Sequence, residues 1–259
     1  MIKNKIKFKI VVSLIVYIFS APVISHEKLS QLSWLGKFIG KEIIIDNPYG
    51  NVRMRYGGEN NAIEYIAVIQ NLDAKVNLVV TKETKDVNKI IFTVIDEENE
   101  KQDYAIKSRL DLTFFIPKDK NILVKTRNGL IEAKGLLANI FAKTIDGDIV
   151  LSKNKGTINS ISDSGEINAT ITRLKDKSSQ QFISQTGDIN IWVNRKAHYL
   201  IEVATSSDII TDFSMKIKNL YNQEPNKKGI IKLNKKKSKI IIKSKRGRTA
   251  IRGFGKDVK

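Results

Sequence analysis

The chain of 259 residues is long enough for one large domain or two smaller ones, and its 41% of apolar residues is sufficient for a folded core. It contains no cysteine, which excludes disulfide bonds, thiolate nucleophiles and cysteine-ligated metal sites, and its two histidines are too few for a multi-histidine metal site. Its 45 basic residues exceed its 27 acidic residues and give a formal net charge of +18.

The excess charge lies at the two ends of the chain. Residues 1–25 contain four lysines and no acid, and residues 226–259 contain 14 basic residues against the single acid Asp257. The body between them carries 27 basic and 26 acidic side chains and is close to neutral. The two basic blocks therefore require separate explanations.

Residues 1–25 are expected to be a signal peptide. Lysines at positions 3, 5, 7 and 9 precede the apolar run 10–21, and Val23 and Ser25 occupy the minus-three and minus-one positions of a cleavage site. The run is shorter than the ~20 residues of a membrane-spanning helix, and an uncleaved anchor is the alternative. No cysteine follows the run, which excludes a lipoprotein. The protein is predicted to be exported, either periplasmic or secreted to the cell surface, with no transmembrane span in the mature chain.

Residues 26–40 are predicted to form a short amphipathic segment that caps the following domain or links to it. A membrane-surface helix is the alternative, although only Lys28 and Lys37 would support it. The apolar side chains near helical spacing are Leu29, Leu32, Leu35, Phe38 and Ile39.

From Lys41 onward the pattern predicts β-strands. Short runs rich in β-branched residues are separated by turn-forming clusters such as 47–50, 57–60 and 96–99. The expected strands are 42–45, 52–55, 63–70, 76–81, 89–95, 104–110 and 111–116.

A repeat follows, in which Ser or Thr precedes a glycine by three residues and alternating Ile or Val comes after it. The matching segments are TRNGLIEA (126–133), TIDGDIVL (144–151), SDSGEINA (162–169), SQTGDINI (184–191), TSSDIIT (205–211) and SKRGRTAI (244–251). Their reference positions are Gly129, Gly147, Gly165, Gly187, Ser207 and Gly247. The intervals are 18, 18, 22, 20 and 40 residues, the last being interpreted as two periods.

The repeat has a direct physical interpretation. The glycine permits a positive φ or a tight bend, and the next residues form a short strand whose alternate side chains point into a core. Repetition about every 20 residues predicts an all-β fold, a parallel β-solenoid-like stack over residues 41–253, with its clearest repeats in 110–253 and a basic tail at 254–259.

The segment LDLTFFIPKDKNILVKTRNGLIEAKGLLANIFAKTIDGDIVL, residues 110–151, resembles the bacterial putative adhesin family, exported proteins of unknown function with a β-solenoid-like repeat domain. In this segment a strand ends at Pro117-Lys118, and two T-x-x-G motifs follow eighteen residues apart. NPYGNVRMR (47–55) is similar to the family's opening strand and SKRGRTAIRG (244–253) to its last rung. The resemblance implies a surface or envelope role and defines no catalytic residues.

Acidic residues beside the repeat glycines could form a carboxylate ladder, either for Ca²⁺ or for the acid pair of a polysaccharide lyase or glycosidase. Aspartates also stabilise turns by accepting local backbone N–H groups, which is the favoured interpretation, so no catalytic residue, metal or cofactor is expected. His198 is predicted to be packed or at the solvent edge. The acids are Asp146, Asp148, Asp163, Glu166, Asp188 and Asp208.

The C-terminal basic block is the candidate binding site. It would attract an anionic envelope lipid or glycan, or another envelope protein; nucleic acid is not expected, because Phe254 is the only aromatic residue available for stacking. The alternative is that its lysines protect the strand edge of the final rung from aggregation. The candidate residues are Lys235, Lys236, Lys237, Lys239, Lys243, Lys245, Arg246, Arg248 and Arg252.

Together these patterns predict an exported, non-enzymatic, adhesin-like scaffold or binding protein of the cell envelope. The alternative function is a carbohydrate-active β-helix enzyme that uses acids on one face. The two differ in whether two of the repeat aspartates converge in a groove.

Overall fold

The alternation of apolar and polar residues produces β-strands throughout, and the all-β class predicted from the sequence is confirmed. A computed structural model describes residues 28–58, 61–71, 76–98, 108–172, 177–235 and 238–255. All the secondary-structure elements in these ranges are β-strands, and they form two sheets. The predicted signal peptide and the expected strand residues 104–107 lie outside the described residues.

Ten strands form the first sheet and eleven form the second. In spatial order, the ten-stranded sheet contains β1 (Lys28–Lys37), β4 (Ala62–Asn71), β7 (Arg109–Ile116), β3 (Val52–Tyr56), β9 (Ile131–Lys134), β11 (Ile149–Ser152), β13 (Ile167–Ile171), β15 (Ile189–Asn194), β21 (Thr249–Phe254) and β17 (Ile209–Thr211). The eleven-stranded sheet contains β18 (Met215–Asn219), β19 (Lys227–Lys232), β16 (Tyr199–Thr205), β20 (Ser238–Ser244), β14 (Ser179–Ser184), β12 (Ile158–Ser162), β10 (Asn139–Thr144), β8 (Asn121–Thr126), β2 (Glu42–Asn47), β6 (Lys89–Asp96) and β5 (Leu78–Asp86).

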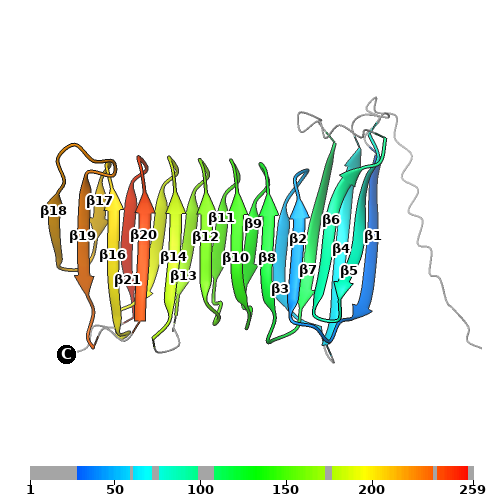
Figure 1. The fold of residues 1–259 in the computed structure, drawn as a ribbon, viewed down its shortest axis with the longest axis horizontal. Helices are drawn as coiled ribbons and strands as arrows, with labels where there is room; N and C mark the ends of the chain where they lie inside the picture. The colour runs from blue at the N-terminus through cyan, green and yellow to red at the C-terminus, as the bar shows by residue number, and fades with distance from the viewer. Residues whose placement is uncertain are drawn as a thin grey trace, which may run out of the picture.

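In the middle of the chain, successive strands alternate between the two sheets and pair in parallel with the strand two places later. β8 pairs with β10 and β10 with β12, while β9 pairs with β11 and β11 with β13. Paired residues are 18 apart in the sequence, as for Asn121 and Asn139, and 22 apart at the next step, as for Asn168 and Asn190. These are the spacings of the sequence repeat. We call one strand from each sheet, with its turns, a rung, and the whole array the stack (Figure 1).

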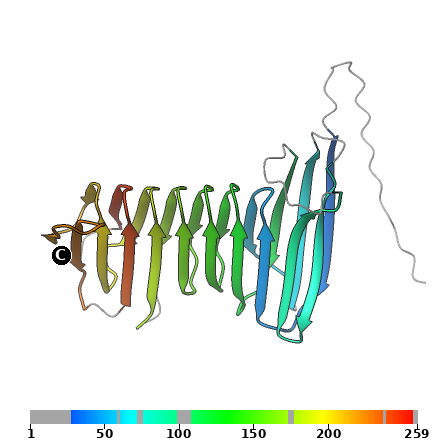
Figure 2. The ribbon, with the colours of Figure 1, turned by 45° about the horizontal axis from the view of Figure 1, so that its top comes forward.

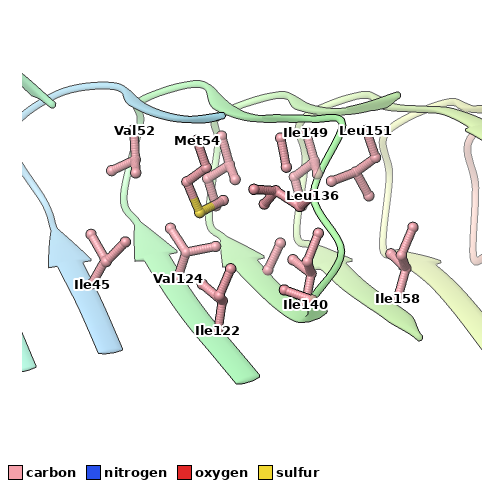
Figure 3. Packing of buried hydrophobic residues seen from close by; sticks show 14 of the residues in the cluster. Ile45, Val52, Met54, Ile122, Val124, Leu136, Ile140, Ile149, Leu151 and Ile158 are labelled. Atoms are coloured by element: carbon pink, nitrogen blue, oxygen red, sulfur yellow. The ribbon is translucent and has the colours of Figure 1, made fainter. Parts of the chain in front are cut away.

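The core lies between the two sheets, where the inward side chains of every rung meet. Figure 3 shows Val52, Met54 and Ile149 from the ten-stranded sheet facing Val124 and Ile140 from the eleven-stranded sheet. All five are at most 2% exposed. Each rung therefore buries its apolar face against its own partner strand and against the neighbouring rungs.

The two ends of the stack are antiparallel. β1 pairs with β4 and β4 with β7 at one end, and β16, β19 and β18 form an antiparallel series at the other (Figure 2). The helical spacing predicted for residues 26–40 is wrong, because Lys28–Lys37 form the edge strand β1. Leu32 and Leu35, which produced that spacing, are 53% and 67% exposed and are not a buried helical face.

The last two strands lie inside the stack, and the expectation that residues 244–253 form its final rung is wrong. β20 lies between β14 and β16, and β21 lies between β15 and β17. The chain thus runs past this position to make β16–β19, then returns to fill it. The 40-residue interval before Gly247 is an excursion and not two regular periods (Figures 1 and 2).

The repeat glycines stack directly on one another. A Cβ added to Gly147 would lie 2.1 Å from the carbonyl oxygen of Gly129, and one added to Gly165 would lie 1.9 Å from that of Gly147. The same relation joins Gly187 to Gly165, and Gly247 to Gly187, both at 2.1 Å. None of the repeat glycines has a left-handed backbone. They are therefore required by the close approach of successive turns and not by a positive φ.

The Ser or Thr three residues before each glycine ties the turns together. The Ser244 hydroxyl accepts a hydrogen bond from the Gly247 N–H (2.8 Å) and donates one to the carbonyl oxygen of Gly187 (3.0 Å). Thr205 donates in the same way to the carbonyl of Gly247 (2.7 Å). These hydroxyls are buried, so each satisfies backbone groups that would otherwise be unpaired inside the stack.

Candidate functional site

The structure places the predicted C-terminal basic residues within the stack and not on a free tail. β20 and β21 each have a neighbouring strand on both sides, so their charges do not protect a final edge. Lys235 is exposed in the turn before β20, and Lys236 and Lys237 lie outside the described residues.

Most of the other predicted binding residues are paired with acids. The partners and N–O distances are Lys239 with Glu202 (2.9 Å), Lys245 and Arg246 with Glu224 (3.1 and 2.9 Å), Arg248 with Asp188 (3.1 Å), and Arg252 with Asp212 (3.1 Å). Such partly exposed pairs add little stability individually, but each neutralises charge locally. Five of the nine predicted residues are therefore paired with acids from other parts of the chain.

Asp212 is the most extensively bonded of these acids. Its carboxylate accepts hydrogen bonds from the Gly253 N–H (2.9 Å), from Arg252 (3.1 Å) and from Arg195 (3.4 Å). The Gly253 N–H and the Arg252 guanidinium hold the pKa of Asp212 below its ordinary value of 3.8. Asp212 therefore fastens β21 to the excursion that follows β17.

We expect Asp212→Asn to lower the free energy of unfolding by about 1 kcal/mol at pH 7, because it weakens charged hydrogen bonds. The contribution of Asp212 is present above its unfolded pKa and is lost as the pH falls through its lower folded pKa. The difference between the two proteins should therefore shrink below about pH 3. Urea denaturation at both pH values tests this, with Asp163→Asn as a control. An equal difference at both pH values would contradict the assignment.

A different group of lysines is unpaired and shares one face. Lys216 and Lys218 lie on β18, Lys228 and Lys232 on β19, and Lys243 on β20, all exposed. The register places them on the outer face of the eleven-stranded sheet, because Lys218 is opposite Lys228 and both Lys228 and Lys243 are opposite Ala204. None has an ion pair with a residue that the structure describes. We call these five residues the outer lysine face.

The outer lysine face destabilises the folded sheet, and no described acid compensates for it. Lys218 and Lys228 are directly opposed in an antiparallel pair, where like charges destabilise a sheet. Glu202, the nearest acid in the register, is already paired with Lys239. Ile230, 42% exposed, lies among these lysines. Such a surface attracts anions, and its position at the end of the stack leaves it accessible.

Sequence reasoning missed four members of this face, since only Lys243 was among the predicted residues. The block was selected by the density of basic residues along the chain. The relevant signal was alternation: in MKIKN (215–219) and KKGIIK (227–232), every second residue faces outward.

The acids beside the repeat glycines bond to the turns of neighbouring rungs. The carboxylate of Asp148 accepts the Glu166 N–H (2.8 Å), and that of Asp188 accepts the Arg248 N–H (2.8 Å). His198 likewise accepts the Lys235 N–H at its Nδ1 (3.1 Å). The turn interpretation predicted local bonds within each turn, whereas Asp148 and Asp188 bond to residues 18 and 60 positions away and so connect neighbouring rungs.

A shallow cleft of about 600 Å³ lies on the outer face of the eleven-stranded sheet, lined in part by Leu123, Phe141 and Asn139. Its one acidic lining residue is Glu42, which is paired with Lys89 (3.3 Å). The repeat aspartates do not line this cleft. In the described part of the chain, no helix is long and apolar enough to cross a membrane.

Comparison with known proteins finds no matching family model and no matching curated protein. The chain is similar in structure to a putative cell adhesion protein from Clostridium sporogenes, at 8% identity over 88% of this chain and 100% of the other, with a TM-score of 0.49. It is also similar to a putative adhesin from Bacteroides fragilis, at 12% identity over 87% of this chain and 97% of the other (TM-score 0.32). A putative lipid binding protein from Parabacteroides distasonis matches at 12% identity over 88% and 97% (TM-score 0.31).

Proposed function

We propose that this chain is an exported, non-enzymatic, adhesin-like binding protein, built as a β-solenoid, that holds an anionic envelope partner on its outer lysine face. The observation that carries the proposal is the separation of its charges. The arginines of the C-terminal block are paired with acids, whereas five exposed lysines at one end have no acidic partner among the described residues.

The geometry supports recognition of repeated charges. Lysines on β18, β19 and β20, three of the last four strands of the eleven-stranded sheet, are spread over a flat surface, and no described cleft encloses them. A flat cationic surface suits a partner that presents many phosphate or carboxylate groups, as the headgroups of an anionic lipid layer or an acidic glycan do. Lysine is a compact point charge that does not require a planar, bidentate partner.

The domain organisation forms part of the proposal. The signal peptide would occupy residues 1–25 and the folded domain would extend to about residue 253, with a short basic tail after it. The domain would begin earlier than residue 41, because β1 starts at Lys28 and pairs with β4 along its whole length.

We expect replacement of Lys216, Lys218, Lys228, Lys232 and Lys243 by Gln to weaken anion binding at least tenfold, since each lysine near an anionic surface contributes roughly 1 kcal/mol. Binding would be measured separately on a soluble polyuronate and on vesicles containing phosphatidylglycerol. The two arms distinguish a glycan from a lipid source of the charge. Binding of the unaltered protein should weaken steeply as salt rises.

A matched control removes five lysines from the middle of the stack, where they are also exposed and have no ion pair with described residues. The substitutions are Lys125→Gln, Lys134→Gln, Lys143→Gln, Lys153→Gln and Lys155→Gln. Both variants lose the same charge, so only position differs. Equal weakening in both would overturn the assignment of the site, and binding that is insensitive to salt would overturn the electrostatic mechanism.

A further inference from the structure

Two turns meet at the end of the stack opposite the outer lysine face. One, Phe38–Lys41, joins β1 to β2, and the other, at Val87–Asn88, joins β5 to β6, at the blue and cyan end of Figure 1. The Lys41 N–H donates to the backbone oxygen (3.1 Å) and side-chain oxygen (2.9 Å) of Asn88. A Cβ on Gly40 would lie 2.6 Å from the Asn88 Cα. We call residues 37–41 and 87–88 the N-terminal corner.

A buried lysine clamps this corner from inside. Lys120 is 3% exposed, and its ammonium group donates to the carbonyl oxygens of Phe38 (2.9 Å) and Gly40 (2.7 Å). Burial lowers the pKa of Lys120, with Asp119 opposing and Lys41 reinforcing that shift. The Asn121 N–H also donates to the Lys41 carbonyl (2.6 Å). The backbone of the first turn is therefore held between the start of β8 and the second turn.

This fixed backbone presents two aliphatic side chains to solvent. Ile39 is 84% exposed and Val87 is 91% exposed. Backbone contacts fix these turns, and the two side chains contribute little to the core. Polar residues at both positions would therefore leave the packing unchanged. The hydration of Ile39 and Val87 is unfavourable unless something apolar receives them.

Cationic groups surround the side chains of Ile39 and Val87, which we call the two tips. A cleft of about 570 Å³ is lined by Ile39 and Val87 together with Lys37, Lys41 and Lys82. Lys82 lies 4.7 Å from the ring centroid of Trp34. A second cleft, of about 680 Å³, adds Lys118 and the carboxylate of Asp119 beside Ile39.

Three further acids of this region are already bonded. Glu42 pairs with Lys89 (3.3 Å), Glu83 pairs with Lys85 (2.6 Å), and Asp86 accepts the Asn88 N–H (2.6 Å). Lys37, Lys41 and Lys118 form no ion pair with a described residue. The corner thus combines protruding apolar tips with unneutralised positive charge.

We propose that the N-terminal corner is a contact site for an anionic lipid surface. Ile39 and Val87 would enter the boundary between headgroups and acyl chains, and the surrounding lysines would lie at the headgroup phosphates. Two separate tips on rigid turns fit a fluid, deformable layer, which can close around each of them. A protein partner would need matching holes, and a contiguous flat apolar patch would suit it better.

The absence of cysteine from the chain allows a site-specific test. Ile39→Cys or Val87→Cys in the full chain would carry an environment-sensitive fluorophore, and Tyr221→Cys, at a position 87% exposed near the other end, is the matched control. With vesicles of phosphatidylcholine and phosphatidylglycerol, we expect a blue shift and a several-fold rise in emission at 39 and 87 and no change at 221. Spin-labelled lipids should quench only the first two.

A second variant tests the energetic role of the tips without a label. Ile39→Ser together with Val87→Ser should weaken partition to the same vesicles about tenfold, because two exposed aliphatic groups lose their apolar environment. Lys125→Ser with Lys143→Ser, away from the corner, should have a smaller effect. Unchanged partition of the corner variant would overturn the proposal.

Two label outcomes would also overturn it. Emission at 39 and 87 that stays like that at 221 on vesicle-bound protein would show that the corner does not enter lipid. A blue shift at 39 or 87 before vesicles are added would show that another segment of the chain, or a second copy, covers the tips. At a vesicle concentration that saturates binding, substituting the outer lysine face should leave the signals at 39 and 87 unchanged, so the two proposals can fail independently.

Discussion

Removing residues 238–259 is expected to unfold the C-terminal end of the stack. β20 is the only strand between β14 and β16, and β21 is the only one between β15 and β17. The deletion therefore removes the parallel neighbours of β16 and β17, and it separates β18 and β19, which pair antiparallel beyond β16, from the rest of the stack. It also removes Ile240, Ile242 and Ile251, each at most 1% exposed, whose burial contributes roughly 5 kcal/mol or more.

Limited proteolysis with mass spectrometry would locate the damage. Cleavage should appear across residues 195–235 in the truncated chain, while residues 121–171 remain protected. A chain lacking only residues 256–259 is the control and should resist cleavage like the intact protein. If the long truncation left residues 199–235 protected, the intercalated strand order would be wrong. For the same reason this deletion cannot test anion binding, which requires point substitutions.

Gly165→Ala is expected to destabilise the protein by about 3 kcal/mol, which lowers its melting temperature by roughly 6–12 °C. The added Cβ would lie 1.9 Å from the Gly147 carbonyl oxygen, so the two rungs would have to separate. The other side of this turn is equally close, because a Cβ placed on Gly187 would lie 2.1 Å from the Gly165 carbonyl oxygen. Gly165 is therefore packed against a neighbouring rung on both sides, and both contacts resist the separation. Thermal denaturation followed by circular dichroism would measure the loss.

Gly135→Ala provides the matched control. Gly135 has a φ of +73° and nothing within 4 Å of an added Cβ, so the substitution costs only left-handed backbone strain, about 1 kcal/mol. The two substitutions distinguish the two reasons for a glycine, which are close packing at Gly165 and backbone conformation at Gly135. Equal losses in the two variants would mean that the repeat glycines serve backbone conformation after all.

The local structure of the repeat could be predicted from the sequence, because the Ser/Thr-x-x-Gly motif and the alternation after it are properties of neighbouring residues. Gly129, Gly147 and Gly165 occupy equivalent places as their spacing indicated. The order of the last rungs could not be predicted in this way. Nothing within SKRGRTAI distinguishes a strand at the end of the stack from one inserted between β15 and β17, since both positions require the same inward side chains.

The candidate site could not be predicted from local sequence either. Charge density along the chain indicated Arg246 and Arg248, yet these residues meet Glu224 and Asp188 from distant parts of the sequence. Lys218 and Lys228 are separated by a turn and adopt opposed positions only in the folded sheet. A binding surface depends on which charges remain unpaired, and this follows from the tertiary contacts.

The intercalation of β20 and β21 also sets the order in which the molecule can be completed. A polypeptide emerges from the ribosome, or from a translocation channel, with its N-terminus first. The rungs from β8 to β15 can stack as they emerge, since each needs only the one before it. β16–β19 have no place to dock until the final segment arrives and inserts ahead of them. Assembly of the outer lysine face is therefore the last event in the biogenesis of this protein, and an incompletely delivered chain would lack it.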